Sequence, residues 1–82
     1  MQEYQSLHTQ SVVKAFQWDG SDESLEGLDL PVMISEPDSG IVQLKTDDGL
    51  VEMHMGYYFM LTEKGWTGLG SDAFQAEYLP LT

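Results

Sequence analysis

The sequence predicts a mostly β protein with a minor α part: a single small antiparallel barrel or strongly coiled sheet with one or two short helical turns. Three observations indicate this class. Short runs rich in β-branched and aromatic residues recur along the chain, separated by turn signals built from glycine, proline, aspartate and serine. A lone glycine at position 56 interrupts the longest apolar stretch, which is typical of a bulge or corner in a sheet. The 82 residues, 41% of them apolar, suffice for one small core.

The N-terminal segment is polar. Residues 1–10 show no clear period, and Tyr4 and Leu7 are their only sizeable apolar side chains. We therefore predict that residues 1–10 form a flexible tail, or an arm that docks on a neighbour, and that residues 11–82 form a single β-rich domain.

The first strand is predicted at Ser11–Trp18 (SVVKAFQW), which is rich in β-branched and aromatic residues. Phe16 and Trp18 share one face of this strand, while Val13 and Ala15 lie on the other. Both faces are partly apolar, as expected of a strand inside a curled sheet.

An acidic segment follows, with no lysine to balance its five acids, which are Asp19, Asp22, Glu23, Glu26 and Asp29. Ser21 is a suitable cap for a short helix, and acids in a first helical turn are favourable. We expect Leu25 and Leu28 to face the core and Gly27 to end the turn. The segment is either a solvated helical turn between two strands or a dedicated binding face.

A β-hairpin is predicted in the middle of the chain. Pro31–Ser35 is a short strand, and the turn at 36–40 leads to an alternating strand at Ile41–Thr46. Asp47-Asp48-Gly49 forms the tight loop, because glycine tolerates the left-handed backbone that such loops need. The return strand places Val51, Met53 and Met55 on one face, opposite Leu50, Glu52 and His54.

The C-terminal third is predicted to build the rest of the sheet. Tyr57–Thr62 follows the corner at Gly56 and returns through a turn at 63–65 into Trp66–Leu69. Ser71 is expected to cap a single helical turn through Phe74. Gln75–Leu79 is then predicted as a closing strand, which Pro80 stops.

Composition limits the classes of function. Fourteen acids face three lysines and no arginine, so the formal net charge is −11, which repels nucleic acid and anionic lipid. The chain has no cysteine, and therefore no disulfide and no thiolate metal site. No apolar run approaches the roughly 18 residues of a membrane span, and the N-terminus is too polar for a signal peptide. These features favour a protein that works inside a cell or in a particle assembled there.

The residues predict no catalytic, metal or cofactor site. Only two histidines exist; His54 stands two positions from Glu52 in a predicted strand, and two ligands are too few for a metal site. Gly65, Gly68 and Gly70 lack the spacing of a dinucleotide loop. Serines near acids are explained by caps and turns. We expect no enzyme, no cofactor and no metal.

Parts of the sequence resemble a group of small uncharacterised proteins of tailed bacteriophages and prophages. The similarity lies in the opening Val13–Trp18 (VKAFQW), in Gly56–Met60 (GYYFM), in Gly65 and in the ending Asp72–Tyr78 (DAFQAEY). That group has an AFQW-like opening, a GDWIV-like strand, a glycine turn and a DxFxxxY-like close. Tyr57 departs from it, since the group usually has an acid at this position. The resemblance implies a phage origin rather than a mechanism.

The sequence therefore predicts a small acidic protein that acts by binding. The first hypothesis is a host-directed accessory or inhibitory factor that engages a basic or nucleic-acid-binding surface of a bacterial protein, in the host cytoplasm. The alternative is a minor virion or assembly protein that self-associates. Exposed aromatic residues and methionines can anchor a partner, although a small core uses the same residues. The residues expected to contact the partner are Asp19, Asp22, Glu23, Glu26, Asp29, Asp47, Asp48, Tyr57, Tyr58 and Trp66.

Overall fold

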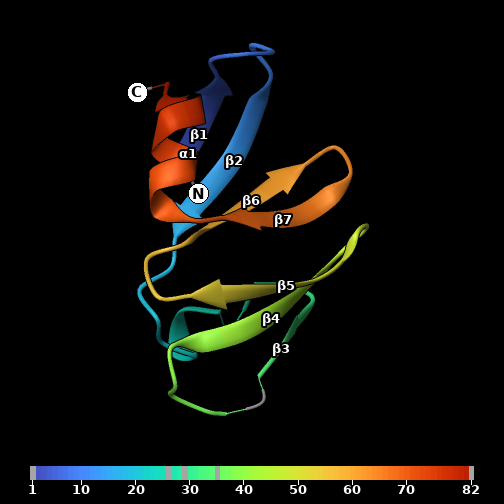
Figure 1. The fold of residues 1–82 in the computed structure, drawn as a ribbon, viewed down its shortest axis with the longest axis vertical. Helices are drawn as coiled ribbons and strands as arrows, with labels where there is room; N and C mark the ends of the chain where they lie inside the picture. Colours follow the sequence, from blue (N-terminus) through green and yellow to red (C-terminus); the bar gives the residue numbers. More distant parts are fainter. Residues whose placement is uncertain (1, 26, 29, 35, 82) are drawn as a thin grey trace.

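Two antiparallel sheets and one short helix make up the structure (Figure 1), a computed structural model that describes residues 2–25, 27–28, 30–34 and 36–81. The elements in chain order are β1 (Gln2–Ser6), β2 (Val12–Gln17), the 3-10 turn η1 (Glu23–Leu25), β3 (Val32–Met33), β4 (Ile41–Thr46), β5 (Gly49–His54), β6 (Tyr58–Thr62), β7 (Gly65–Leu69), α1 (Ser71–Glu77) and β8 (Tyr78–Pro80). The larger sheet has the order β7-β6-β2-β1-β8 and the smaller one β3-β4-β5. The molecule is elongated, 36 × 23 × 22 Å.

The predicted class, mostly β with antiparallel strands and a minor helical part, is confirmed, but the described strands close no barrel. The two sheets are hydrogen-bonded separately, and the chain crosses between them after β2 and after β5. In Figure 1 the smaller sheet occupies the lower half of the molecule, with β5 below β7.

The N-terminal segment differs from the predicted flexible tail. Residues Gln2–Ser6 form β1, which lies between β2 and β8 and pairs with both. Tyr4 packs edge-on against the rings of Phe74 and Tyr58, with centroids 4.9 and 6.2 Å away. β1 is mostly polar and has one aromatic residue, Tyr4, so its sequence shows little alternation of apolar and polar residues. Its place in the sheet therefore depends on partners far along the chain.

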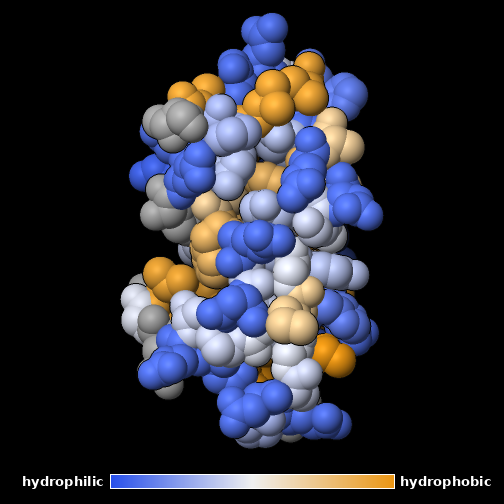
Figure 2. All heavy atoms as spheres, turned by 90° about the vertical axis from the view of Figure 1, so that its left-hand side faces the viewer, coloured by the Kyte–Doolittle hydropathy of each residue, from blue (hydrophilic) through white to orange (hydrophobic). Residues whose placement is uncertain are grey.

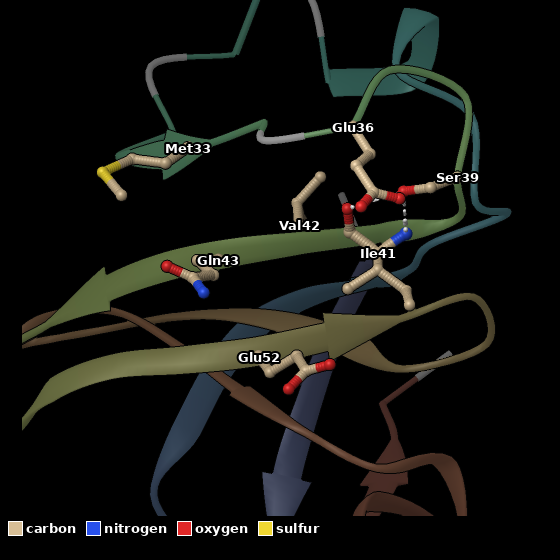
Figure 3. A pocket seen from close by; sticks show the side chains of 7 residues that line it. All are labelled: Met33, Glu36, Ser39, Ile41, Val42, Gln43 and Glu52. Carbon is tan, nitrogen blue, oxygen red and sulfur yellow. Dashed lines mark hydrogen bonds between the residues drawn. The ribbon is translucent and has the colours of Figure 1, made fainter.

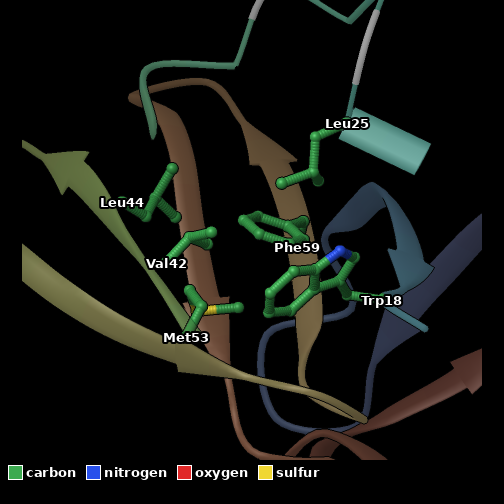
Figure 4. Packing of buried hydrophobic residues seen from close by; sticks show 6 residues of the cluster. All are labelled: Trp18, Leu25, Val42, Leu44, Met53 and Phe59. Atoms are coloured by element: carbon green, nitrogen blue, oxygen red, sulfur yellow. The ribbon is translucent and has the colours of Figure 1, made fainter. Parts of the chain in front are cut away.

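The larger sheet contributes to two hydrophobic clusters, one on each face. The first lies between the two sheets (Figure 4) and contains Trp18, Leu25, Val42, Leu44, Met53 and Phe59. The second lies under α1 and contains Val13, Ala15, Tyr58, Met60 and Phe74. Strand β2 serves both clusters, as the partly apolar character of its two faces predicted, and so does β6.

The central hairpin is confirmed, but its loop is one residue shorter than predicted, because Gly49 is the first residue of β5. Thr46 pairs with Gly49 across the two-residue loop, and Gly49 has a φ of 120°. Val42 and Leu44 are buried while Ile41 is exposed, as the alternation requires. The preceding strand, β3, covers Val32–Met33 of the predicted Pro31–Ser35, and Ser35 lies outside the described residues. Beside this pair, the Lys45 N–H donates to the Pro31 carbonyl at 2.8 Å.

Gly56 marks the crossing from the smaller sheet to the larger. Its φ is 93°, which an L side chain rarely adopts. Its N–H donates to the carbonyl of Trp18, and the Trp18 N–H donates to the carbonyl of Tyr57, both at 2.8 Å. These two bonds hold the two inter-sheet connections together, so the predicted corner is a junction between sheets.

The acidic segment forms one 3-10 turn. The Ser24 N–H donates to Ser21 Oγ at 3.3 Å, which is the predicted cap. Leu25 is buried in the first cluster, but Leu28 is exposed, contrary to the prediction. Leu28 follows the end of the turn, so the helical spacing that would place it beside Leu25 does not apply.

The C-terminal helix is longer than the predicted single turn. α1 runs over Ser71–Glu77 and takes up residues that were expected to form a strand; β8 begins only at Tyr78. Gly70, not Ser71, is the N-cap, and no side chain caps the helix. Phe74 stacks on Tyr58 at 4.0 Å and on Tyr78 at 4.9 Å, and this packing holds a segment of modest helical propensity in a helix.

Candidate binding surface

The acids of the 19–25 segment are exposed or partly buried, and two of them support local structure. Asp19 Oδ1 accepts hydrogen bonds from the Ser21 N–H at 2.9 Å and from Ser21 Oγ at 2.7 Å. These bonds to Ser21 lower the pKa of Asp19. Asp22 Oδ2 accepts the Asp38 N–H at 3.0 Å, so Asp22 ties this segment to the turn before β4. Glu23 is exposed. Glu26 and Asp29 lie outside the described residues.

The predicted acids form two separate groups. Asp47 and Asp48 are exposed at the β4–β5 loop, where the Asp48 N–H donates to Thr46 Oγ1 at 3.2 Å. The contact of Asp22 with Asp38 lies near the opposite end of β4, about 17 Å away along a six-residue strand. A partner that touches both groups must therefore span the length of the hairpin.

The three predicted aromatic contacts are not fully exposed. Tyr58 is only 8% exposed and stacks on Phe74, so it is a core residue and is not available to a partner. Tyr57 and Trp66 are half-buried against the first cluster. Of the methionines that could form a contact surface, Met53 and Met60 are buried, and Met55 is exposed. The core of this small domain absorbs most of its large side chains.

The exposed apolar side chains among the described residues are aliphatic or methionine rather than aromatic. Figure 2 shows one side of the molecule, where hydrophilic residues predominate and apolar residues form separate patches. The exposed residues are Leu7, Val12, Leu28, Met33, Ile34, Ile41, Leu50, Met55, Leu79 and Leu81.

One group of these residues lies on the side of the smaller sheet that faces away from the first cluster. We call it the outer face, and the strand register defines it. Directly paired residues point to the same side of a sheet. The outer face therefore contains three rows of paired residues, Met33/Gln43/Glu52, Ile41/His54 and Lys45/Leu50.

The outer face is apolar and partly acidic. Met33, Ile41 and Leu50 are 51%, 40% and 56% exposed. A hollow of about 230 Å³ is lined by residues of β3, β4 and β5 and of the turn before β4, including Val42 of the first cluster. Two of its lining residues are carboxylates, Glu36 and Glu52. Figure 3 shows Met33 and Gln43 toward one end of the hollow and Glu36 and Ile41 toward the other.

Of the two carboxylates that line the hollow, one has an ionisable partner within ion-pair distance among the described residues and the other has none. Glu52 Oε1 lies 3.1 Å from His54 Nε2, and this contact, an ion pair when His54 is protonated, is the one such contact among the described residues. Glu36 has no such pair there. Lys45 is the one lysine on the outer face, and it lies in the row with Leu50, beyond the residues that line the hollow.

The outer face is not evident from the sequence, although the alternation predicts Leu50, Glu52 and His54 on one side of the hairpin. The period-2 alternation of β4 and β5 shows which side chains share a face, but not whether a further layer covers it. The sequence signal that was available is the presence of Ile41 and Leu50 on the polar side of the alternation.

Within the described ranges, no group of three or more histidine and acidic side chains is placed to hold a metal ion. Among the same residues, no helix is long and apolar enough to cross a membrane. The surface offers carboxylates, amides and aliphatic groups, which suit recognition of cationic and apolar groups.

Comparisons with family models, with curated proteins and with solved structures found no match to this chain.

Proposed function

We propose that this chain is an acidic binding protein that docks on a basic surface of another protein and catalyses no reaction. The observation that carries the proposal is the charge. A net charge of −11 on 82 residues sets up a negative potential around the whole molecule. Such a potential accelerates encounter with a cationic surface and disfavours encounter with nucleic acid or anionic lipid.

The resemblance to small phage proteins suggests the kind of partner. In this proposal the chain is host-directed, and its target is a bacterial protein whose basic surface ordinarily binds nucleic acid. The two acidic groups, around Asp22 and Asp38 and at Asp47 and Asp48, are about 17 Å apart along β4. Two separated groups of carboxylates suit an extended basic surface better than a single cation.

The experiment is a salt titration on a captured partner. Tagged protein would be incubated with bacterial lysate, and the retained protein identified by mass spectrometry and purified. Affinity would then be measured from low to moderate salt for the native chain and for a variant with Asn or Gln at Asp19, Asp22, Glu23, Glu26 and Asp29. Amide side chains keep the acceptor oxygens that Ser21 and Asp38 use, so local structure is preserved.

The expected result is a steep loss of affinity with salt for the native chain and a weaker dependence for the five-acid variant, because fewer charges contribute to long-range attraction. The difference between the two proteins should be largest at low salt. An affinity that is the same for both proteins at every salt concentration would refute the proposal.

A second candidate is a structural protein that self-associates, and one patch favours it. Leu7, Leu79 and Leu81, each about half exposed, lie around a hollow of about 380 Å³ beside Pro80. Light scattering distinguishes the two functions: a defined oligomer supports the structural role, and a monomer supports binding to another protein. The oligomer would have to bring together chains that each carry −11, so it should dissociate at low salt.

A further inference from the structure

The outer face of the smaller sheet is a partly apolar surface beside carboxylates, and this combination specifies an occupant. We propose that it binds a short basic amphipathic segment of a partner protein, with one aliphatic side chain in the hollow and flanking lysine or arginine side chains at Glu36 and Glu52. The inference rests on the proposed function and adds to it a site for one segment of the partner, separate from the acids that provide long-range attraction.

The apolar part of the surface is built from two rows of the register. Met33 and Ile41 are half exposed, and both line the hollow. Its volume, about 230 Å³, has room for an aliphatic side chain. Burial of such a side chain is favourable by about 25 cal/mol for each Å² of apolar area removed from water.

The charges around the hollow favour a positively charged partner. Both ionisable groups that line the hollow are carboxylates, and the nearby turn adds Asp38, whose N–H is held by Asp22. The cationic groups on the face are Lys45 and, when protonated, His54. A lysine or arginine side chain of a basic segment can contact Glu36 directly, and another can take the place of His54 beside Glu52.

A second copy of the chain suits this surface less well. Self-association through the outer face would bring Glu36 and Glu52 of two molecules together, and each molecule carries a net charge of −11. Like charges at an interface are repulsive. The occupant that the charges favour is therefore a basic segment of another protein.

The experiment uses two synthetic peptides of equal charge, one of alternating lysine and leucine and one of alternating lysine and serine. Each is titrated into isotopically labelled protein, and amide shifts and dissociation constants are measured by NMR. We expect the lysine–leucine peptide to bind more tightly and to shift amides of β3, β4 and β5 around Gln43 and Glu52. Shifts centred on another part of the chain would overturn the assignment.

Two charge-matched variants locate the electrostatic contribution. Glu36→Gln with Glu52→Gln removes two charges at the hollow, and Asp47→Asn with Asp48→Asn removes two at the loop. The first pair of substitutions should raise the dissociation constant of the lysine–leucine peptide about fivefold, the effect of losing two exposed ion pairs. The second pair should raise it less than about twofold. Equal weakening would overturn the inference and leave general electrostatic binding, and thus the proposed function, intact.

Two aliphatic variants test the apolar contribution. Ile41→Thr removes an exposed aliphatic side chain from the outer face and keeps a β-branched residue in the strand. Leu79→Thr is the control, because Leu79 is 53% exposed but lies in β8. Only Ile41→Thr should weaken binding of the lysine–leucine peptide, and neither substitution should change the affinity for the lysine–serine peptide. A failure of both peptides to bind would overturn the inference, while the lysate capture still tests the proposed function separately.

Discussion

Gly68 shows how closely the two sheets pack at a single residue. It lies in β7, and a Cβ at this position would overlap the sulfur of Met53, which is fully buried in the first cluster. A glycine within a strand often marks such a close approach. Met53 can fill the space between the sheets only because position 68 has no side chain.

Replacing Gly68 with alanine should therefore destabilise the protein by about 1–3 kcal/mol, the usual effect of overpacking a core. The control is Gly70→Ala, where the closest atoms to the new Cβ are 3.8 Å away on the Tyr57 ring. Its effect should lie within about 0.5 kcal/mol of zero, because loss of a glycine N-cap and reduced entropy of the unfolded chain oppose each other. Urea unfolding measures the change in the free energy of unfolding for both variants. Equal changes would contradict the explanation that Gly68 is required by close packing against Met53.

Two tyrosines make the stability of the folded protein depend on pH in the alkaline range. Burial raises the pKa of Tyr4, with a smaller contribution from Tyr58, and burial raises the pKa of Tyr78, with a smaller contribution from Glu77. The folded state thus holds the phenol protons more tightly than the unfolded chain. This stabilisation is complete below the unfolded pKa, about 10, and is lost as pH rises through the folded pKa.

We expect the urea midpoint to fall between about pH 9 and about pH 11, and to fall less in a variant with phenylalanine at both Tyr4 and Tyr78. Phenylalanine keeps the ring contacts with Phe74 and removes the titrating group. Tyr57→Phe, whose ring packs against the other cluster, is the control. An identical pH dependence in the native chain and the double variant would show that these phenols do not contribute.

At the scale of elements, β8 is an edge strand that is protected from further pairing. The N–H groups of alternate residues point to opposite sides of a strand, and the Leu81 N–H donates to the Glu3 carbonyl in β1. Position 80 therefore faces outward, and as proline it has no N–H. The other outward N–H, at Tyr78, is bonded to the Phe74 carbonyl. The outer edge of β8 thus offers no free donor to another strand.

Pro80→Val should remove this protection by restoring an outward N–H in an edge strand. The expected result is self-association, seen by light scattering as a larger mean mass, at high salt where repulsion between the chains is screened. The native chain at the same salt and concentration is the reference. A variant that stays monomeric at every salt concentration would show that charge alone, rather than the missing donor, keeps the edge unpaired.

The elements differ in how far local sequence determines them. The β4–β5 hairpin was predictable because Asp47, Asp48 and Gly49 form a local turn signal between two alternating strands. β1 was not, because Tyr4 is partly buried only through contacts with Tyr58 and Phe74, which are distant in the chain. The length of α1 depends in the same way on the packing of Phe74.

The candidate surface was predictable only in its charge. The positions of the acids are visible in the sequence, and the segment containing Asp22 was recognised as a possible binding face. Its link to Asp38 and the exposure of Met33 and Ile41 depend on the tertiary arrangement. Tyr58 shows the converse error, because an aromatic residue that suits an interface equally suits a core.

At the scale of the whole molecule, the same charge that supports binding opposes folding. Fourteen acids and three lysines are carried by a molecule 36 Å in its longest dimension, so negative charges greatly outnumber positive ones. Folding concentrates this charge, and the compact state is destabilised by self-repulsion. Unlike most globular domains of balanced charge, this one should gain stability when sodium chloride screens its surface.

We expect the melting temperature to rise as sodium chloride increases from about 10 mM to about 0.5 M, over which the Debye length falls from about 30 Å to a few ångströms. A gain of about 1 kcal/mol would raise Tm by about 4–8 °C in a domain of this size. The five-acid variant described above, with a formal charge of −6, should begin at a higher Tm and respond less to salt. If both proteins respond equally to salt, these five acids do not contribute to the self-repulsion that salt screens.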